Sequence, residues 1–113
     1  MRLIKSFKNA IHGLVIAWRE QRNMKIHSVA ILVVVTVGFY FDFSYTDWCL
    51  VSLAIGAVLG MEVMNSSVEE LVNFVSPEKR KAAGRIKDMA AGAVLVVAIL
   101  AALIGLIILL SKL

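Results

Sequence analysis

Three polar side chains fall on one stripe of a helix where an apolar segment ends. Glu62, Asn65 and Glu69 stand at positions i, i+3 and i+7, so an α-helix places them on one face over two turns. A carboxylate at the edge of hydrocarbon is costly unless it is paired, metal-bound or solvated in a cavity. Carboxylate and amide oxygens suit Mg²⁺, and a second carboxylate can act as a general base toward a hydroxyl. The stripe therefore indicates either a site or a helix that becomes a solvated surface helix here.

Two other polar groups could supply the remaining chemistry. Lys87 and Asp88 follow a basic run, and a carboxylate–lysine set in a basic surround suits a metal-bound polyphosphate. The second group is E-Q-R-N-M-K-I-H at residues 20–27, in which His27 alone is a weak signal. The sequence contains no glycine-rich phosphate loop, and we find no Ser/His/Asp arrangement or Cys/His metal set.

The composition predicts a single-domain, all-α membrane protein over residues 1–113. Hydrophobic residues make up 60% of the chain, far more than a soluble domain of this size exposes or buries. The one cysteine excludes an intrachain disulfide.

The apolar pattern predicts one surface helix followed by three membrane spans. In residues 2–22, apolar residues recur at helical spacing on one face and basic residues occupy the other face. This pattern is typical of an amphipathic helix that lies in the membrane interface. The spans are expected at about residues 24–41, 48–70 and 89–110. Ser76, Pro77 and Glu78 predict the start of the last helix, with Ser76 as its N-cap. Gly56 and Gly60 form a G-x-x-x-G face roughly opposite the acidic stripe, which favours close helix packing there.

The distribution of cations predicts the topology. Eleven of the 12 Lys and Arg residues lie in residues 2–25 and 79–87, and none lies in the first connection. The positive-inside rule then places the N-terminus and the second connection in the cytoplasm. The polar residues of all three regions are expected to meet at one level, the cytoplasmic interface. Topology also explains the cations better than nucleic-acid binding does.

At these residues the chain resembles a known family, the small prokaryotic diacylglycerol kinases, which include undecaprenol kinases. The family pattern E-x-x-N-(S/T)-A-(I/V)-E reads here as E-V-M-N-S-S-V-E at residues 62–69, with Ser67 in place of the usual Ala. A second pattern, A-K-D followed by small residues, reads here as I-K-D-M-A-A-G-A at residues 86–93. The resemblance extends to R-N-M-K-I-H at residues 22–27 and covers nearly the whole chain.

The resemblance implies an integral-membrane kinase that transfers the γ-phosphate of MgATP to a lipid alcohol. It makes Glu62 the general base, Glu69 a ligand of Mg²⁺, and Asn65 the residue that orders the catalytic face. Arg2 and Lys25 become candidates for lipid or phosphate contacts. The implied ATP contacts are Glu69, Glu78, Arg80, Lys87 and Asp88.

The resemblance further implies a homotrimer with sites shared between subunits, in the cytoplasmic (inner) membrane of a bacterium. Gly56 and Gly60 would then serve subunit packing. The substrate is undecaprenol or diacylglycerol, and the run K-D-M-A-A-G-A-V favours the undecaprenol branch.

Two departures from the family pattern leave alternatives open. The second metal carboxylate of the family should fall at position 21, which is Gln21 here, whereas its neighbour Glu20 would point about 100° away on a helix. Either Gln21 coordinates through its carbonyl oxygen or a local rotation brings in Glu20. Asn73 stands where the family frequently has Asp. A catalytically impaired member that acts as a membrane scaffold is therefore the alternative to a kinase. A channel or transporter is disfavoured, because the polar groups gather at one interface rather than along a pore.

Overall fold

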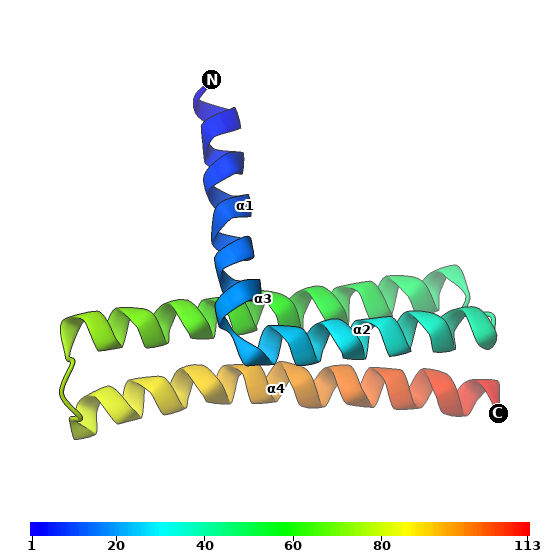
Figure 1. Ribbon diagram of the computed structural model, residues 1–113. Coiled ribbons are helices and arrows are strands. Elements are labelled where there is room, and N and C mark those ends of the chain that lie inside the picture. Colours follow the sequence, from blue (N-terminus) through cyan, green and yellow to red (C-terminus); the bar gives the residue numbers. More distant parts are fainter.

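The computed structural model describes residues 1–113 as four helices without strands. These are α1 (Arg2–Glu20), α2 (Arg22–Tyr40), α3 (Tyr45–Val75) and α4 (Lys81–Lys112). Figure 1 shows α2, α3 and α4 side by side, with α1 standing crosswise to them. The last three are long and apolar enough to cross a membrane. The predicted all-α class, with a first helix and three candidate membrane spans after it, is therefore confirmed, and α3 and α4 extend beyond the expected spans.

The membrane bundle has little core of its own. Only eight of the 113 residues are buried, and large apolar side chains are exposed along every helix. In water this surface would be strongly unfavourable, whereas hydrocarbon solvates it. The all-α membrane class thus follows from the exposed faces as well as from the composition.

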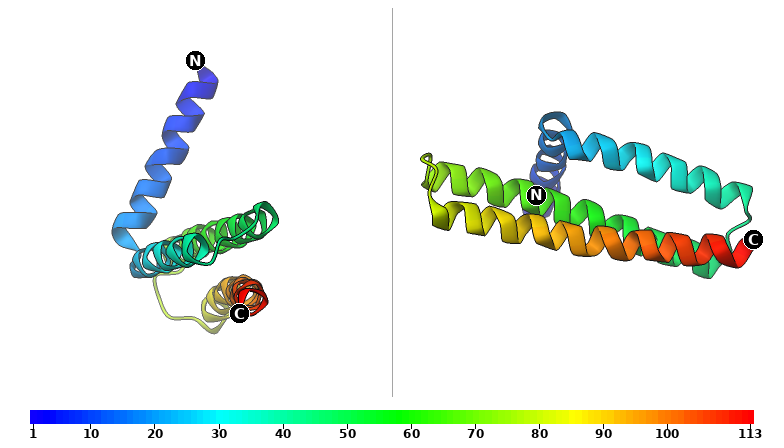
Figure 2. Two further views of the ribbon diagram at one scale, coloured as in Figure 1. Left: turned by 90° about the vertical axis from the view of Figure 1, so that its right-hand side faces the viewer. Right: turned by 90° about the horizontal axis from the view of Figure 1, so that it is seen from below.

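The α1–α2 junction is a sharp break at one residue. Gln21 has an extended backbone, with φ −102° and ψ 118°, and its N–H closes α1 on the carbonyl of Ala17. Because the helix is interrupted, α1 can leave the bundle sideways, as the left view in Figure 2 shows. A helix at this angle to its neighbours can lie along a membrane surface while α2 enters the membrane.

The α2–α3 connection is tight and is fixed by a reciprocal cap. Asp42 adopts a left-handed backbone with φ 52°, and Ser44 and Asp47 form a capping box at the start of α3. The Trp48 ring then packs between Phe39 and Phe43, with centroid distances of 5.2 and 5.4 Å. This aromatic cluster holds the end of α2 against the beginning of α3.

The α3–α4 connection contradicts the predicted helix start at Ser76. The N–H of Ser76 closes α3 on Val72, and its hydroxyl donates to the Glu78 carbonyl at 3.2 Å. Ser76 is therefore the C-cap of α3 rather than the N-cap of α4. Helix α4 begins only at Lys81, after an extended Arg80 that makes no side-chain cap.

Two polar bridges fix the antiparallel register of α3 and α4. Lys112 Nζ lies 2.8 Å from Asp47 Oδ2 at one end, and Lys87 Nζ donates to Asn73 Oδ1 at 2.6 Å near the other. Counting between the bridges places Glu62 about level with Ala98. In Figure 1, α3 and α4 continue as a hairpin well past the first residues of α2.

Candidate active site

Glu62 is the most deeply buried charged side chain of the molecule. It is 2% exposed, and its carboxylate faces the first turns of α2. Asn23 Nδ2 donates to Oε1 at 3.3 Å, and His27 Nε2 lies 3.4 Å from Oε2. Each carboxylate oxygen therefore has one partner, which compensates part of the cost of removing the charge from water.

Asn65 and Glu69 continue the stripe away from Glu62, as predicted. The Asn65 Oδ1 atom is buried and has no hydrogen-bond partner within the chain. Glu69 is half-buried and forms no ion pair. Two side chains whose oxygen atoms lack protein partners, one of those oxygens being buried, are therefore available as metal ligands on one face of α3.

The chain alone does not assemble a complete metal site. It contains no cluster of three or more His, Cys, Asp or Glu side chains. Mg²⁺, however, is commonly bound by only one or two protein oxygens, with waters and nucleotide phosphates completing its shell. Glu69 and Asn65 fit that requirement by chemistry and position.

Lys87 and Asp88 lie at a different level from Glu62. Lys87 is bonded to Asn73, which is 11 residues beyond Glu62 on α3, or roughly 16 Å along the helix axis. Glu69 lies between the two levels, about one turn from Asn73. The single level expected from the sequence is thus wrong, and the candidate residues form a line along the α3–α4 hairpin instead.

The break at Gln21 changes the choice between Gln21 and Glu20. Glu20 is the last residue of α1 and is exposed, whereas Gln21 is half-buried in the extended link. The expected 100° separation assumed a continuous helix and does not apply here. Neither side chain is hydrogen-bonded or ion-paired to Glu69, so the metal role of both stays a prediction.

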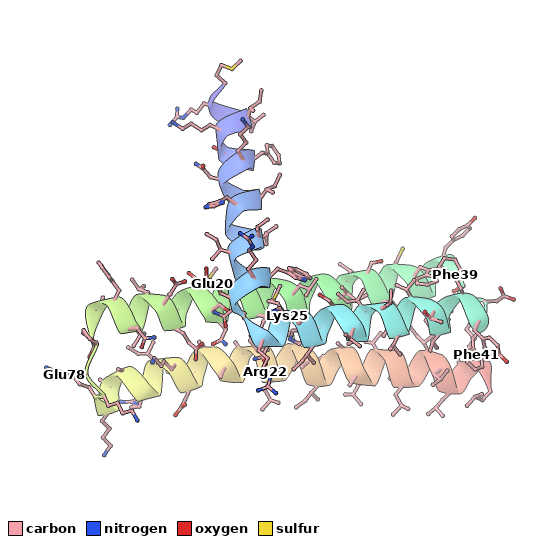
Figure 3. The ribbon with its side chains drawn as sticks, in the orientation of Figure 1. Glu20, Arg22, Lys25, Phe39, Phe41 and Glu78 are labelled. Atoms are coloured by element: carbon pink, nitrogen blue, oxygen red, sulfur yellow. The ribbon has the colours of Figure 1, made fainter.

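Three of the four other candidates lie apart from Glu62 within one chain. Figure 3 shows Lys25 near the foot of α1 and Glu78 at the far tip of the hairpin. Glu78 pairs there with Arg80 at 3.8 Å, and both side chains are exposed. Arg2 lies at the free end of α1, roughly 27 Å along the helix from Glu20. A single chain therefore does not bring Arg2, Glu78 or Arg80 to the buried carboxylate.

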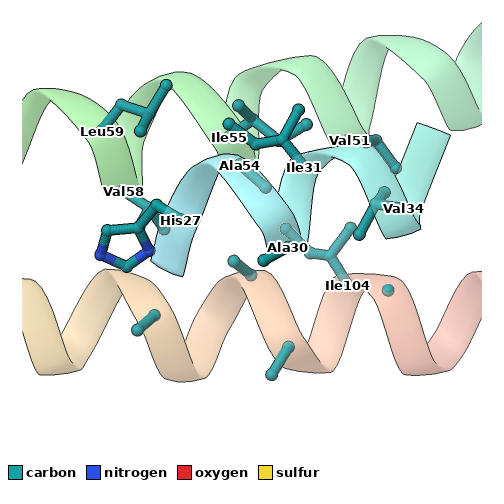
Figure 4. Close-up of a pocket in the computed structure, with 14 residues that line it drawn as sticks. His27, Ala30, Ile31, Val34, Val51, Ala54, Ile55, Val58, Leu59 and Ile104 are labelled. Atoms are coloured by element: carbon teal, nitrogen blue, oxygen red, sulfur yellow. The ribbon is translucent and has the colours of Figure 1, made fainter. Parts of the chain in front are cut away.

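An apolar cavity of about 250 Å³ opens between α2, α3 and α4 beside the site. Twelve of its 14 lining residues are hydrophobic, and many are small, including Ala30, Ala54 and Ala101. Figure 4 shows the His27 ring at one end of this lining. His27 thus borders both the cavity and the Glu62 carboxylate.

Asn23 and His27 are the site residues that sequence reasoning missed. Both lie in the polar group at residues 20–27, four positions apart and therefore on one face of α2. That spacing was the available signal, together with the apolar Met24 on the same turn, which is fully buried. The sequence could not show that this face meets Glu62.

Comparisons with known proteins identify the family of the chain. The sequence model described as prokaryotic diacylglycerol kinase matches residues 8–109. Undecaprenol kinase of Bacillus subtilis is 36% identical over 112 residues, covering 99% of this chain and 91% of that protein. Diacylglycerol kinase of Escherichia coli K12 is 30% identical over 100 residues, covering 88% and 82% respectively. Diacylglycerol kinase of Synechocystis is 31% identical over 104 residues, which are 91% of this chain and 59% of that protein. With a buried carboxylate facing the first turns of α2 and sequence matches to relatives over nearly its whole length, this chain belongs to the prokaryotic diacylglycerol kinase family.

Proposed function

We propose that the protein is an ATP-dependent kinase that transfers the γ-phosphate of MgATP to the hydroxyl of a membrane lipid alcohol. The observation that carries the proposal is the Glu62 carboxylate, held by two α2 side chains next to an apolar cavity. A lipid alcohol needs an apolar place for its chain and a base for its hydroxyl. Those two features lie side by side here.

Glu62 acts as the general base. It removes the proton of the lipid hydroxyl while that oxygen attacks the γ-phosphorus and the bond from phosphorus to the ADP oxygen breaks. Burial supports this role, because a site that excludes water protects ATP from hydrolysis and strengthens electrostatic interactions. The fixed orientation of the carboxylate reduces the entropy lost on reaching the reactive geometry.

Glu69, Asn65, Lys87 and Asp88 bind the nucleotide along the hairpin. Glu69, together with the unpaired Asn65 Oδ1, would hold Mg²⁺, which supplies charge neutralisation at the β- and γ-phosphates. The Lys87 ammonium has three N–H donors, and Asn73 accepts a hydrogen bond from only one of them. The line from Glu62 to Lys87 thus suits an elongated polyphosphate whose reacting end lies at Glu62.

Undecaprenol is the substrate that we favour over diacylglycerol. The support is the higher identity to the relative named undecaprenol kinase, 36% against 30% for the E. coli diacylglycerol kinase. In either case the cavity would hold the part of the chain nearest the hydroxyl.

A homotrimer with its sites toward the cytoplasm completes the proposal. A Cβ atom added to Gly56 or Gly60 would meet nothing within 4 Å, so this face of α3 is open to another helix. A second subunit could also bring Arg2, Glu78 or Arg80 closer to a neighbouring site. The cation distribution supports a cytoplasmic N-terminus in the bacterial inner membrane.

A direct assay with matched variants tests the kinase. Purified protein in detergent micelles would be given labelled ATP, Mg²⁺ and either undecaprenol or diacylglycerol. Glu62→Gln should lower lipid phosphorylation at least roughly a hundredfold, and chelation of Mg²⁺ by EDTA should abolish it reversibly. Glu70→Gln is the control, because Glu70 is an exposed acid on the same helix. Full activity of Glu62→Gln would overturn the role of Glu62. Failure of the wild type on both lipids would overturn the kinase and favour a membrane scaffold.

A further inference from the structure

The Glu62 carboxylate is too deeply buried to be oriented by solvent. At 2% exposure, its side chain depends on protein partners for both charge compensation and direction. Its own helix supplies neither, since the Ser66 hydroxyl donates to the Glu62 backbone carbonyl at 3.0 Å rather than to the carboxylate. The partners therefore come from a different helix.

We propose that Asn23 and His27 are positioning residues that clamp the Glu62 carboxylate during catalysis, one on each oxygen. They are four residues apart on α2, so one face of that helix presents an amide and an imidazole together. Asn23 Nδ2 donates to Oε1 at 3.3 Å, and His27 Nε2 lies 3.4 Å from Oε2, where the tautomer with its proton on Nε2 donates to the carboxylate. This inference rests on the proposed function, and it adds two α2 residues to a site otherwise built on α3 and α4.

The clamp also connects the base to the cavity. His27 is half-buried and lines the apolar cavity between α2, α3 and α4. A hydroxyl that approaches Glu62 from this cavity would therefore come in beside the imidazole ring.

Because Asn23 and His27 each contribute one donor to the carboxylate, matched substitutions at the two positions can test the clamp. Asn23→Asp keeps the shape of the side chain and removes its donor. His27→Leu removes the imidazole donor, and His27→Gln restores an N–H donor on a side chain of similar reach. A hydrogen bond to a charged group that is lost in the transition state corresponds to a roughly ten- to hundredfold lower rate.

The first experiment measures kcat and KM for lipid phosphorylation. Asn23→Asp and His27→Leu should each lower kcat by that factor, with the KM for ATP changed by less than about threefold, because the nucleotide lies along the hairpin. His27→Gln should recover most of the lost kcat. The control is Val29→Ala, on an exposed face of α2. Wild-type kcat in His27→Leu, or an equal loss in His27→Gln, would overturn the clamp.

The second experiment tests the contact without relying on activity. The chain has two histidines, so the imidazole ¹⁵N NMR signals of His12 and His27 can be assigned from single variants. Glu62→Gln should move the His27 signals and leave those of His12, which lies on an exposed face of α1, unchanged. Unmoved His27 signals would overturn the clamp even in an active enzyme. If the wild type phosphorylates no lipid, the proposed function fails, while this measurement still decides the contact.

Discussion

Gly38 should be the glycine of this chain that least tolerates a side chain. A Cβ atom at this position would lie 2.7 Å from Trp48 Cζ2, closer still to Trp48 Cη2, and 3.1 Å from Phe43 Cδ2. The indole is rigid and packs between Phe39 and Phe43, so it cannot turn away without disturbing the aromatic cluster. We therefore expect Gly38→Ala to force the end of α2 away from α3.

The expected magnitude follows from two opposing terms. Overpacking of this kind costs about 1–3 kcal/mol, and two ring atoms within 3.0 Å place it in the upper half of that range. Replacing glycine by alanine inside a helix returns up to about 1 kcal/mol. The net destabilisation of Gly38→Ala is therefore about 1–3 kcal/mol.

Gly105→Ala is the matched control, because a Cβ atom there meets nothing within 4 Å. It should leave stability unchanged or raise it by up to about 1 kcal/mol. Reversible unfolding by SDS in mixed micelles would measure both variants against the wild type. A Gly38→Ala protein as stable as Gly105→Ala would refute the packing of Trp48 on α2. Adding Trp48→Leu to Gly38→Ala should recover part of the lost stability.

Two further substitutions test the polar bridges of the α3–α4 pair. Asn73→Leu should release Lys87 and raise the KM for ATP about two- to fivefold at unchanged kcat, since an oriented ammonium is worth about 0.5–1 kcal/mol. An unchanged KM in a steady-state titration would show that Asn73 does not orient Lys87 for the nucleotide. Lys112→Met should break the 2.8 Å pair with Asp47 and lower the unfolding free energy slightly. In the same mixed-micelle assay, that loss should shrink at high salt, and a loss independent of salt would contradict an ionic origin.

The helices were predictable because their signals are local. Helical spacing of apolar residues located α1, and three long apolar segments located the spans. The wrong helix start at Ser76 shows the limit of such signals. Serine, proline and an acid form a good helix start by propensity, but the Ser76 N–H was already committed to closing α3. Competition between the end of one helix and the beginning of the next is not visible in either pattern alone.

The site was predictable along α3 and unpredictable across helices. The spacing of Glu62, Asn65 and Glu69 determines that they share a face of α3. Which neighbour that face meets depends on the rotation of α2, and the hydropathy of α2 fixes that rotation poorly, because lipid accepts apolar side chains in every direction. The contacts of Asn23 and His27 with Glu62 therefore emerged only from the packed bundle. The separate level of Lys87 has a similar cause, because it depends on the length of the hairpin beyond α2.

The three polar residues on this face of α3 differ in whether their oxygen atoms have protein partners, and this difference indicates what a ligand must supply. Glu62 has a partner on each oxygen, while the buried Asn65 Oδ1 has none and Glu69 has no cation. A buried oxygen without a partner costs about 1–3 kcal/mol, and a half-buried carboxylate also gains from a counter-charge. The chain could have supplied one, yet the ammonium of Lys87 is bonded to Asn73 one turn away. Protein partners are thus present at Glu62, which would meet the lipid hydroxyl, and absent at Asn65 and Glu69, which would hold a metal-bound phosphate. That asymmetry is what an enzyme needs if its base is built in and its metal arrives with the nucleotide.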